Sequence, residues 1–395
     1  MNDDTGMMPG SNTPQIRRAV SQSEDPELAA EELYGQMHQS DMELGIFFCS
    51  PEYDLEALGL ALAKRFGQSR LIGCTTAGEI TPLGYADNSI TGVALSAGSF
   101  TCVERRIDNI SKFRMQDGAD VVLSLLWEME RKAPKANFQN TFALLLIDGV
   151  AKSEERVAAA IGSELGNIPL VGGSAADNWR LKETPIFHKG EFHNDAAVVM
   201  LIHTEVPFRV LSTHHYEPGT AKAVITEADP VRRIVYEING EPAAREYARL
   251  CGLDVADLSP AIFAEHPLVV KIGGKHYTRG MERFYDDLSM QFACAIDKGV
   301  VFTIANAGDP VAHLEGVFDG LRHEIGNIQL VIGCECAARK ISVEAAQMTQ
   351  AMSQTLMRNK VIGFSAFGEQ HNTIHMNNSF TCVAFGSESG AHNAG

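Results

Sequence analysis

The sequence predicts an α/β fold in which mixed sheets are covered by helices, and three observations lead to this class. Short, fully apolar strand candidates alternate with amphipathic helix candidates along the chain. Such strands are typical of sheets whose two faces are buried under helices. One strand–turn–strand phrase is written twice, 290 positions apart. The length of 395 residues also favours two domains or half-domains over one small core.

The two ends of the chain differ from the rest in composition. Residues 1–24 are rich in Asp, Ser, Gly, Pro and Gln, and residues 386–395 contain almost nothing to bury. Neither segment can offset the entropy that ordering it would cost, so both are predicted to be disordered tails. The folded part is expected between about residues 25 and 385.

The predicted elements follow from the spacing of apolar residues. Helices are expected where apolar residues recur every three or four positions, in 54–66 and 343–357. Strands are expected where short runs are apolar throughout or alternate, in 44–50, 141–148, 299–305 and 328–334. Strands and helices in this order predict mixed sheets with helices on their faces.

The repeated phrase is "LIGCTTAGEI" at 71–80 and "VIGFSAFGEQ" at 361–370. The match continues without a gap into "DNSITGVAL" (87–95) and "NNSFTCVAF" (377–385), with nine identities in register. This similarity predicts duplicated half-domains, and the two copies should follow the same strand–turn–strand path. A weaker third copy is expected at 170–179 with 194–202, and a fourth at 330–339, where Gly-Glu is missing.

The Gly-Glu pair of each copy has two interpretations. Gly78 and Gly368 can supply a positive φ where a strand stops, while Glu79 and Glu369 accept backbone N–H bonds. Alternatively, the duplicated strand ends line one shared cleft. The boundary between the halves is expected near 214–224, which gives half-domains at 25–215 and 216–385.

Charge and composition exclude several classes of protein. The net charge of −17 repels phosphate backbones, so nucleic-acid binding is not expected. No apolar run reaches the roughly 20 residues of a membrane helix, and "MNDDTGMMPGSNTPQ" is no signal peptide. Eight scattered cysteines do not form a disulfide framework. These features predict a reduced, cytoplasmic protein that is not bound to a membrane.

Several ordered motifs resemble the signatures of FIST-domain proteins. They are "IGCTTAGEI" (72–80), "GGSAADNW" (172–179), "NGEPAAREY" (239–247) and "GFSAFGEQ" (363–370) followed by "NNSF" (377–380). The resemblance covers roughly residues 30–385 and implies a sensory protein with an N-terminal and a C-terminal FIST half. Such proteins are thought to bind small ligands and to report to signalling partners.

A FIST protein without a fused enzyme domain is similar to NosP, the haem-binding nitric-oxide sensors. That resemblance implies haem b as cofactor, nitric oxide as ligand, and a partner that is a histidine kinase or a cyclic-di-GMP synthase or phosphodiesterase. Homodimerisation stays open. At the junction of the halves this chain has "THHYEPGT" (213–220) in place of the usual Gly-Trp-like pair before the proline. This departure favours the haem-binding branch.

The candidate haem ligands are chosen among thirteen histidines, which show no tight metal-binding spacing. A sensor haem needs a neutral imidazole in an apolar pocket. His215 is the first candidate and His214 the second, because adjacent residues on a strand point to opposite faces. Tyr216 and Pro218 would fix that strand end. His188, in a predicted hairpin, is the third candidate.

Other reactive groups support weaker hypotheses. His371 and His375 are four residues apart in a polar stretch that is typical of a loop. Cys334 and Cys336 would point to one side of a strand end, where they could bind zinc, sense redox state or simply be buried.

The sequence contains no G-x-S-x-G, Walker or dinucleotide motif, so an enzyme is not expected. Three classes remain open. They are a haem-based sensor, a FIST module for another metabolite, and a thiol-dependent enzyme that uses Cys336.

Overall fold

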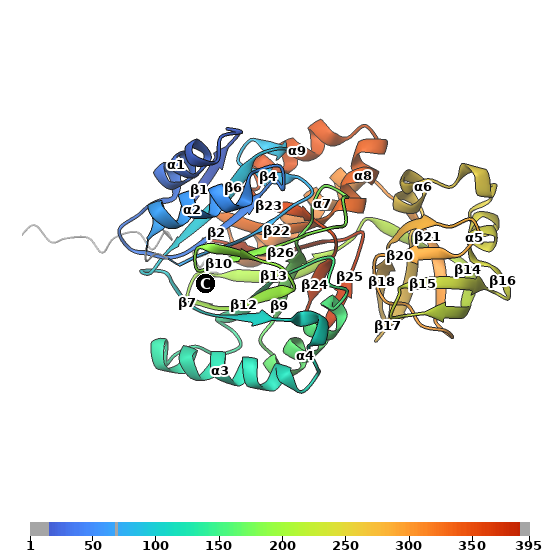
Figure 1. The fold of residues 1–395 in the computed structure, drawn as a ribbon, viewed down its shortest axis with the longest axis horizontal. Coiled ribbons are helices and arrows are strands. Elements are labelled where there is room, and N and C mark those ends of the chain that lie inside the picture. Colours follow the sequence, from blue (N-terminus) through green and yellow to red (C-terminus); the bar gives the residue numbers. More distant parts are fainter. Residues whose placement is uncertain (1–15, 68–69, 388–395) are drawn as a thin grey trace, which may run out of the picture.

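The computed structural model describes residues 16–67 and 70–387, which form a large body with a smaller lobe at one end (Figure 1). The chain leaves the body after strand β13 (Phe208–Thr213) and returns to it at helix α7 (Pro310–Ile325). The residues between them build the lobe. The lobe is therefore an insertion into the body.

The body consists of three units that share one order of elements: strand, helix, strand, helix, strand, hairpin, strand. Unit one contains β1 (Ile16–Ser21), α1 (Pro26–Met37), β2 (Met42–Cys49), α2 (Leu55–Phe66), β3 (Leu71–Thr75), β4 (Glu79–Thr81), β5 (Gly84–Ala86) and β6 (Ile90–Ser96). Unit two contains β7 (Phe100–Asp108), η1 (Ile110–Lys112), α3 (Asp117–Lys132), β8 (Thr141–Ile147), α4 (Glu154–Leu165), β9 (Leu170–Ser174), β10 (Ile186–His188), β11 (Glu191–His193) and β12 (Ala196–Thr204).

Unit three has the same order, except that the lobe follows its first strand and two short helices replace the second helix. It contains β13, α7, β22 (Leu330–Cys336), α8 (Ala337–Ala345), α9 (Thr349–Arg358), β23 (Val361–Ala366), β24 (Glu369–His371), β25 (Ile374–Met376) and β26 (Phe380–Phe385). The lobe contains β14 (Tyr216–Asp229), β15 (Ile234–Ile238), β16 (Glu241–Pro242), α5 (Ala243–Cys251), η2 (Val255–Asp257), α6 (Pro260–Glu265), β17 (Leu268–Ile272), β18 (Lys275–Arg279), β19 (Met281–Phe284), β20 (Met290–Phe292) and β21 (Val301–Ala307).

Each unit forms a six-stranded mixed sheet that is completed by a hairpin from another unit. The hairpin β10–β11 of unit two pairs with β3, the hairpin β24–β25 of unit three pairs with β9, and the hairpin β4–β5 of unit one pairs with β23. The pairs β2–β3, β8–β9 and β22–β23 are parallel. The three hairpins are thus exchanged around a ring, and each one ties two units together.

The ends of β3, β9 and β23 meet through a matching ring of backbone hydrogen bonds. In each unit a backbone N–H just beyond the strand donates to a carbonyl at the end of the corresponding strand in another unit. These bonds join Ala176 to Thr75 at 3.0 Å, Phe367 to Ser174 at 3.2 Å and Ala77 to Ser365 at 2.9 Å. The three units are therefore related by a pseudo-threefold axis that passes through this junction.

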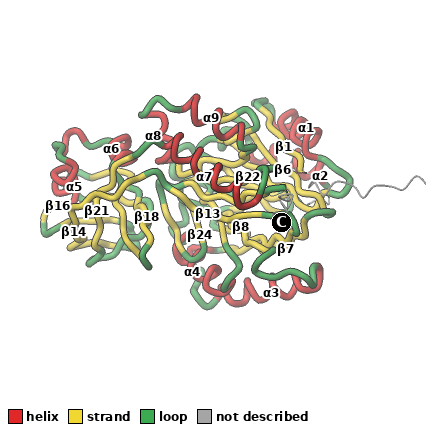
Figure 2. The backbone as a smooth tube through the Cα atoms, turned by 180° about the vertical axis from the view of Figure 1, so that it is seen from behind, coloured by secondary structure: helices red, strands yellow, loops and turns green. Residues whose placement is uncertain are grey.

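The main core lies between the three sheets, and the helices cover their outer faces (Figure 2). Phe48, Phe142 and Phe364 come from different sheets and are buried in one cluster, where the rings of Phe48 and Phe364 stack at 4.6 Å. Aspartate caps define several helix starts: Asp25 and Asp54 each accept a backbone N–H in the first turn of α1 and α2. Strands buried on both faces explain the continuous apolar runs of the sequence.

The predicted α/β class with mixed sheets is confirmed, and so is the shared path of the two repeat copies. The segment β3–β6 and the segment β23–β26 have the same order of strands and hairpin. The weaker third copy forms the corresponding β9–β12. The expected fourth copy at 330–339 is wrong. Its residues form β22 and the start of α8, and β22 corresponds to β2 and β8 instead.

Two other expectations need correction. The helix predicted at 343–357 is interrupted, because α8 ends at Ala345, α9 begins at Thr349, and Gln347 between them has a positive φ of 59°. Residues 16–21 were expected in the N-terminal tail, but they form β1 and pair with β6, which satisfies their backbone groups despite their polar character. Residues 1–15 and 388–395 lie outside the described residues.

None of the helices in the described part of the chain has both the length and the apolar character that crossing a bilayer requires.

Candidate functional site

The hairpins of units one and three share one geometry, and this geometry explains the repeated Gly-Glu pair. Glu79, at the start of β4, accepts hydrogen bonds from Ser89 N at 3.2 Å and Ser89 Oγ at 2.6 Å. Glu369, at the start of β24, accepts from the same two groups of Ser379. Burial raises the pKa of Glu79 to about 7 and also raises the pKa of Glu369. These carboxyl groups hold the start of the last strand in unit one, β6, and in unit three, β26.

Unit two makes the corresponding bond from a different residue. The first residue of β10 is Ile186, so no carboxylate is available there. Asp148, which follows β8, instead accepts from Asp195 N at 2.7 Å and from Thr184 Oγ1 at 2.5 Å. We call each carboxylate that holds the start of the last strand a strand clamp. The third copy is weak in sequence because its strand clamp, Asp148, lies at a different position in the unit.

His215, the first candidate ligand, is packed into the base of the lobe. Its side chain is 4% exposed, its ring lies 4.2 Å from that of Tyr216, and its Nε2 is 3.5 Å from Ser342 Oγ. Burial, together with the charge of Arg339, lowers the pKa of His215 to about 2, so the ring is neutral.

Tyr216 and Pro218 take different positions at the start of β14. The Tyr216 hydroxyl donates to Ala264 O at 2.8 Å and accepts from Asn378 Nδ2 at 3.3 Å, which joins lobe and body. Pro218 is exposed and lies opposite Ala305 of β21. Both residues thus support the lobe, and neither lies in either of the two pockets described below.

His214 and His215 were expected on a strand, but they lie between the end of β13 at Thr213 and the start of β14 at Tyr216, and His214 points to another space than His215. It borders a cavity of about 210 Å³ between body and lobe, which we call the lobe pocket. The lobe pocket is lined by Ser212, Thr213, His214, Lys275, His276, Tyr277, Thr278, His371 and Met376. His371 therefore joins His214 in one pocket, whereas His375 is buried beside Gln370, 3.0 Å from its Nε2.

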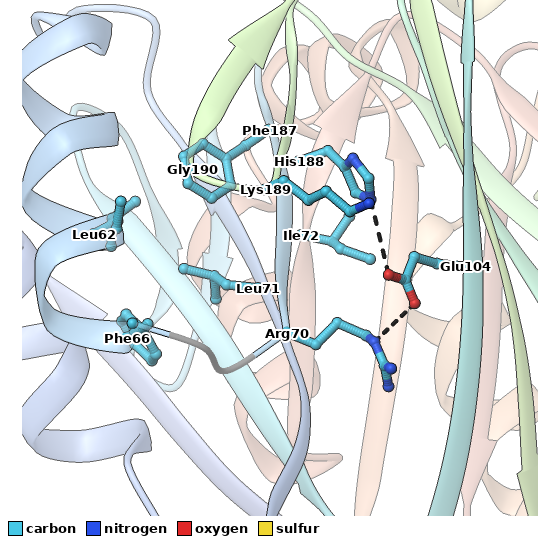
Figure 3. Close-up of a pocket in the computed structure, with 12 residues that line it drawn as sticks. Leu62, Phe66, Arg70, Leu71, Ile72, Glu104, Phe187, His188, Lys189 and Gly190 are labelled. Carbon is cyan, nitrogen blue, oxygen red and sulfur yellow. Dashed lines mark ion pairs between the residues drawn. The ribbon is translucent and has the colours of Figure 1, made fainter. Parts of the chain in front are cut away.

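His188 lies in a separate and larger cavity, of about 440 Å³, which we call the His188 pocket (Figure 3). It is lined by Leu62, Ala63, Phe66, Gly67, Arg70, Leu71, Ile72, Glu104, Phe187, His188, Lys189 and Gly190. The C-terminal turns of α2 and the first residues of β3 border this cavity, and Leu62, Phe66 and Leu71 of these elements are buried in the core beneath α2. His188 ends β10 opposite Ile72 of β3, so the exchanged hairpin carries this histidine into the wall of unit one.

The imidazole of His188 is buried and lacks hydrogen-bond partners. Its residue is 5% exposed, and neither ring nitrogen has a partner within the described residues. The nearest charged group is Glu104, whose Oε1 lies 3.9 Å from His188 Nε2 (Figure 3). A buried polar group without a partner costs roughly 1–3 kcal/mol, so a ligand that bonds to this ring would remove a penalty.

Glu104 is kept ionised by its neighbours. Its Oε2 lies 2.7 Å from Arg70 Nε, and Arg70 Nη1 also contacts Glu43 at 2.8 Å. Burial opposes ionisation of Glu104, but His188 and Arg70 outweigh it, and the pKa of Glu104 lies below its ordinary value. The pocket thus combines a mixed polar and apolar lining with a buried imidazole and a carboxylate held beside it.

The sequence analysis missed Arg70, Glu104 and the wall residues of α2. Glu104 lies in the middle of β7, and a charged residue within a strand was the one available signal. Its distance from His188 could not be foreseen, because β7 and β10 meet only after the hairpin has crossed to unit one.

Seven of the eight cysteines are buried, and Cys251 is partly exposed. Cys334 belongs to the main core and Cys336 ends β22, and burial raises the pKa of both thiols well above its ordinary value. Among residues 16–67 and 70–387, no group of three or more His, Cys, Asp or Glu side chains is arranged to hold a metal ion. The arrangement gives neither cysteine the features of a reactive thiolate.

Comparisons with solved structures find only distant likeness. A cyanuric acid hydrolase from A. caulinodans aligns over 95% of this chain and all of its own, with 7% identity and a TM-score of 0.36. A second cyanuric acid hydrolase structure aligns over 94% of this chain and 99% of its own, with 10% identity and a TM-score of 0.36.

One relative and two domain families match by sequence. An uncharacterised protein of Methanocaldococcus jannaschii is 27% identical over 187 residues, which are 46% of this chain and 35% of that protein. The chain therefore matches about a third of the length of this curated relative. The FIST N domain family matches residues 43–241, and the FIST C domain family matches residues 243–372. Because these matches follow each other over most of the folded chain, the protein belongs to the FIST family of sensory-domain proteins.

Proposed function

We propose that this protein is a haem-binding nitric-oxide sensor that holds haem b in the His188 pocket and reports to a partner enzyme. The observation that carries the proposal is the buried His188 imidazole, without hydrogen-bond partners, in the wall of a 440 Å³ cavity. Cofactor pockets commonly measure about 300–1,000 Å³ and are mostly apolar. The His188 pocket lies in this range of volumes and has a mixed polar and apolar lining; the lobe pocket at His214 is smaller, at about 210 Å³, and His215 is packed between Tyr216 and Ser342.

The residues present fit the chemistry of a haem site. His188 would be the axial ligand, and Ile72, its partner on β3, shares its face of the sheet, whereas Phe187 and Leu71 point to the opposite face, into the core beneath α2. An imidazole that binds a metal commonly gives its other N–H to a carboxylate, and Glu104 lies beside the ring in the place of such a partner. Lys189 supplies positive charge for acidic substituents, whereas Arg70 is already paired with Glu43 and Glu104. When bound, ferrous haem supplies a site for nitric oxide.

The position of His188 supports a role in signalling. The histidine belongs to a hairpin of unit two that pairs with β3 of unit one, with Ile186 opposite Cys74 and His188 opposite Ile72. A change in the bonding of His188 therefore acts directly on the contact between two units. A ligand shifts an equilibrium only through its different affinities for two states, and a contact between rigid units can provide two states.

The ligand is tested by adding haem to the purified protein and recording the absorption spectrum with and without nitric oxide. We expect stoichiometric binding with a Soret band that shifts on addition of nitric oxide. A protein that stays colourless with excess haem would contradict the proposal. It would favour the second candidate function, a FIST module that binds another small metabolite in the same pocket with Lys189 as the charge partner.

We expect the output to pass through a partner rather than through catalysis by this chain. The partner proposed is a histidine kinase or a cyclic-di-GMP synthase or phosphodiesterase. Its activity should be measured with the apo, ferrous and nitric-oxide-bound protein. The three forms should affect the partner differently, and equal effects would contradict the sensor role.

A further inference from the structure

The lobe pocket has a charge pattern that the haem proposal does not use. Lys275 and His276 reach it from β18 of the lobe, His214 from the connection between body and lobe, and His371 from β24 of the body. No carboxylate belongs to its lining, although the protein as a whole carries a net charge of −17. A pocket lined by basic side chains in an acidic protein attracts anions and concentrates them locally.

The basic groups of the lobe pocket are not neutralised by neighbours. Lys275 has no ion pair within residues 16–67 and 70–387, and His214 Nδ1 is buried without a partner there. Burial, and then the charge of His276, lowers the pKa of His214; burial, and then the charge of Lys275, lowers the pKa of His371. An anion in the pocket would reverse these effects and favour protonated histidines.

The kind of donor favours a phosphate group over a carboxylate. Lys275 is a compact point charge and the three imidazoles are single donors, so several donors converge without the planar fork of an arginine. A phosphate group offers three or more oxygens to such donors. The volume of about 210 Å³ suits a small ligand.

We propose that the lobe pocket binds the phosphate group of a small phosphomonoester or inorganic phosphate through Lys275, His276, His214 and His371. Such a ligand would touch both lobe and body, because Lys275 and His276 belong to the lobe, His371 belongs to the body, and His214 lies in the connection between them. The proposal is independent of haem, since the His188 pocket lies in other elements.

Binding to this pocket should depend on pH. The titratable groups that face it are His214, His371, His276, Lys275 and Tyr277, and His313 lies behind Thr213, whose Oγ1 is 2.6 Å from His313 Nε2. An anion that prefers charged histidines binds more tightly as pH falls. Sulfate keeps its charge over this range, so its affinity should rise several-fold between about pH 8 and about pH 6.

The test is calorimetric titration of the full-length protein with inorganic phosphate, glycerol phosphate, sulfate and succinate. Phosphate and glycerol phosphate should bind, and Lys275→Gln should weaken both by about tenfold. Lys298→Gln is the matched control, because Lys298 is an exposed lobe lysine that pairs with Glu227 at 3.1 Å, and it should leave binding unchanged. His276→Ala, on the exposed side of the pocket, should weaken binding without altering the thermal midpoint.

Three results would overturn the assignment. The first is the absence of phosphate binding by the wild-type protein. The second is equal affinity in wild-type protein and a folded Lys275→Gln variant. The third is tighter binding of succinate than of both phosphate ligands, which would replace the phosphate class by a carboxylate class.

Discussion

Two of the three exchanged hairpins carry a histidine at the same position, yet the spaces around them differ. His188 ends β10 and pairs with the second residue of β3, and His371 ends β24 and pairs with the second residue of β9. The fifth residue of the facing strand is Glu104 in β7 and Ser212 in β13. One pocket is therefore larger and contains an acid, and the other is smaller and contains basic side chains without an acid.

The difference comes from what packs beside each hairpin. The residues of α2 and β3 enclose His188, whereas β18 of the inserted lobe brings Lys275 and His276 to His371. The same backbone geometry thus supports two chemistries, because the neighbours of each histidine come from distant parts of the chain. The third hairpin has Thr81 at this position.

The largest expected effect comes from the strand clamps, because their buried carboxyl groups should make the free energy of unfolding depend on pH. Glu79 has a folded-state pKa of about 7, above its ordinary value of 4.5, so its contribution to stability is complete below about pH 4.5 and is lost as pH rises toward 7. The loss is at most about 3 kcal/mol. Glu79→Gln should flatten this decline in chemical denaturation. Glu56→Gln, an exposed change on α2, should retain it, and an unchanged slope in Glu79→Gln would contradict the assignment.

Replacing Glu104 of β7 by serine, the residue type at the equivalent position 212 of β13, should make the His188 pocket more like the lobe pocket. Glu104→Ser removes the carboxylate beside His188 and one ion pair of Arg70. Loss of such an outer partner typically weakens metal binding by about 10- to 100-fold. Haem affinity measured by transfer to apomyoglobin should fall accordingly. Ser212→Ala is the control, and a similar loss there would mean that the pocket assignment is wrong.

Filling the His188 pocket should weaken haem binding by about tenfold or more while the fold is kept. Ala63→Trp places an indole ring in the cavity that Ala63 borders. Leu60→Trp on the same helix is the control, because Leu60 is 65% exposed and points away. Both variants should unfold at similar denaturant concentrations. Unaltered haem affinity in Ala63→Trp would show that haem binds elsewhere.

The sequence predicted the repeating unit well, because the repeat depends on local residues such as Gly73, Glu79 and Ser89 that fix a strand–turn–strand path. The exchange of hairpins could not be predicted, since the pairing of His188 with Ile72 leaves no trace in either segment. The sequence predicted which histidines were candidate ligands. Their order of preference depended on which of them line a cavity. In the sequence, a histidine that binds a ligand in a pocket and a histidine that is packed in the interior look the same. For His215, the packing against Tyr216 and Ser342 distinguishes the second case from the first.

The central claim is tested most directly by comparing haem spectra of His188→Ala, His215→Ala and His371→Ala with that of the wild-type protein. We predict that His188→Ala loses the haem or its axial imidazole, with a clear change in the Soret band, while His371→Ala retains the wild-type spectrum. His215→Ala should also bind haem normally once its folding is verified by circular dichroism. A normal spectrum for His188→Ala together with loss of haem in His215→Ala would contradict the account and place the ligand at the base of the lobe.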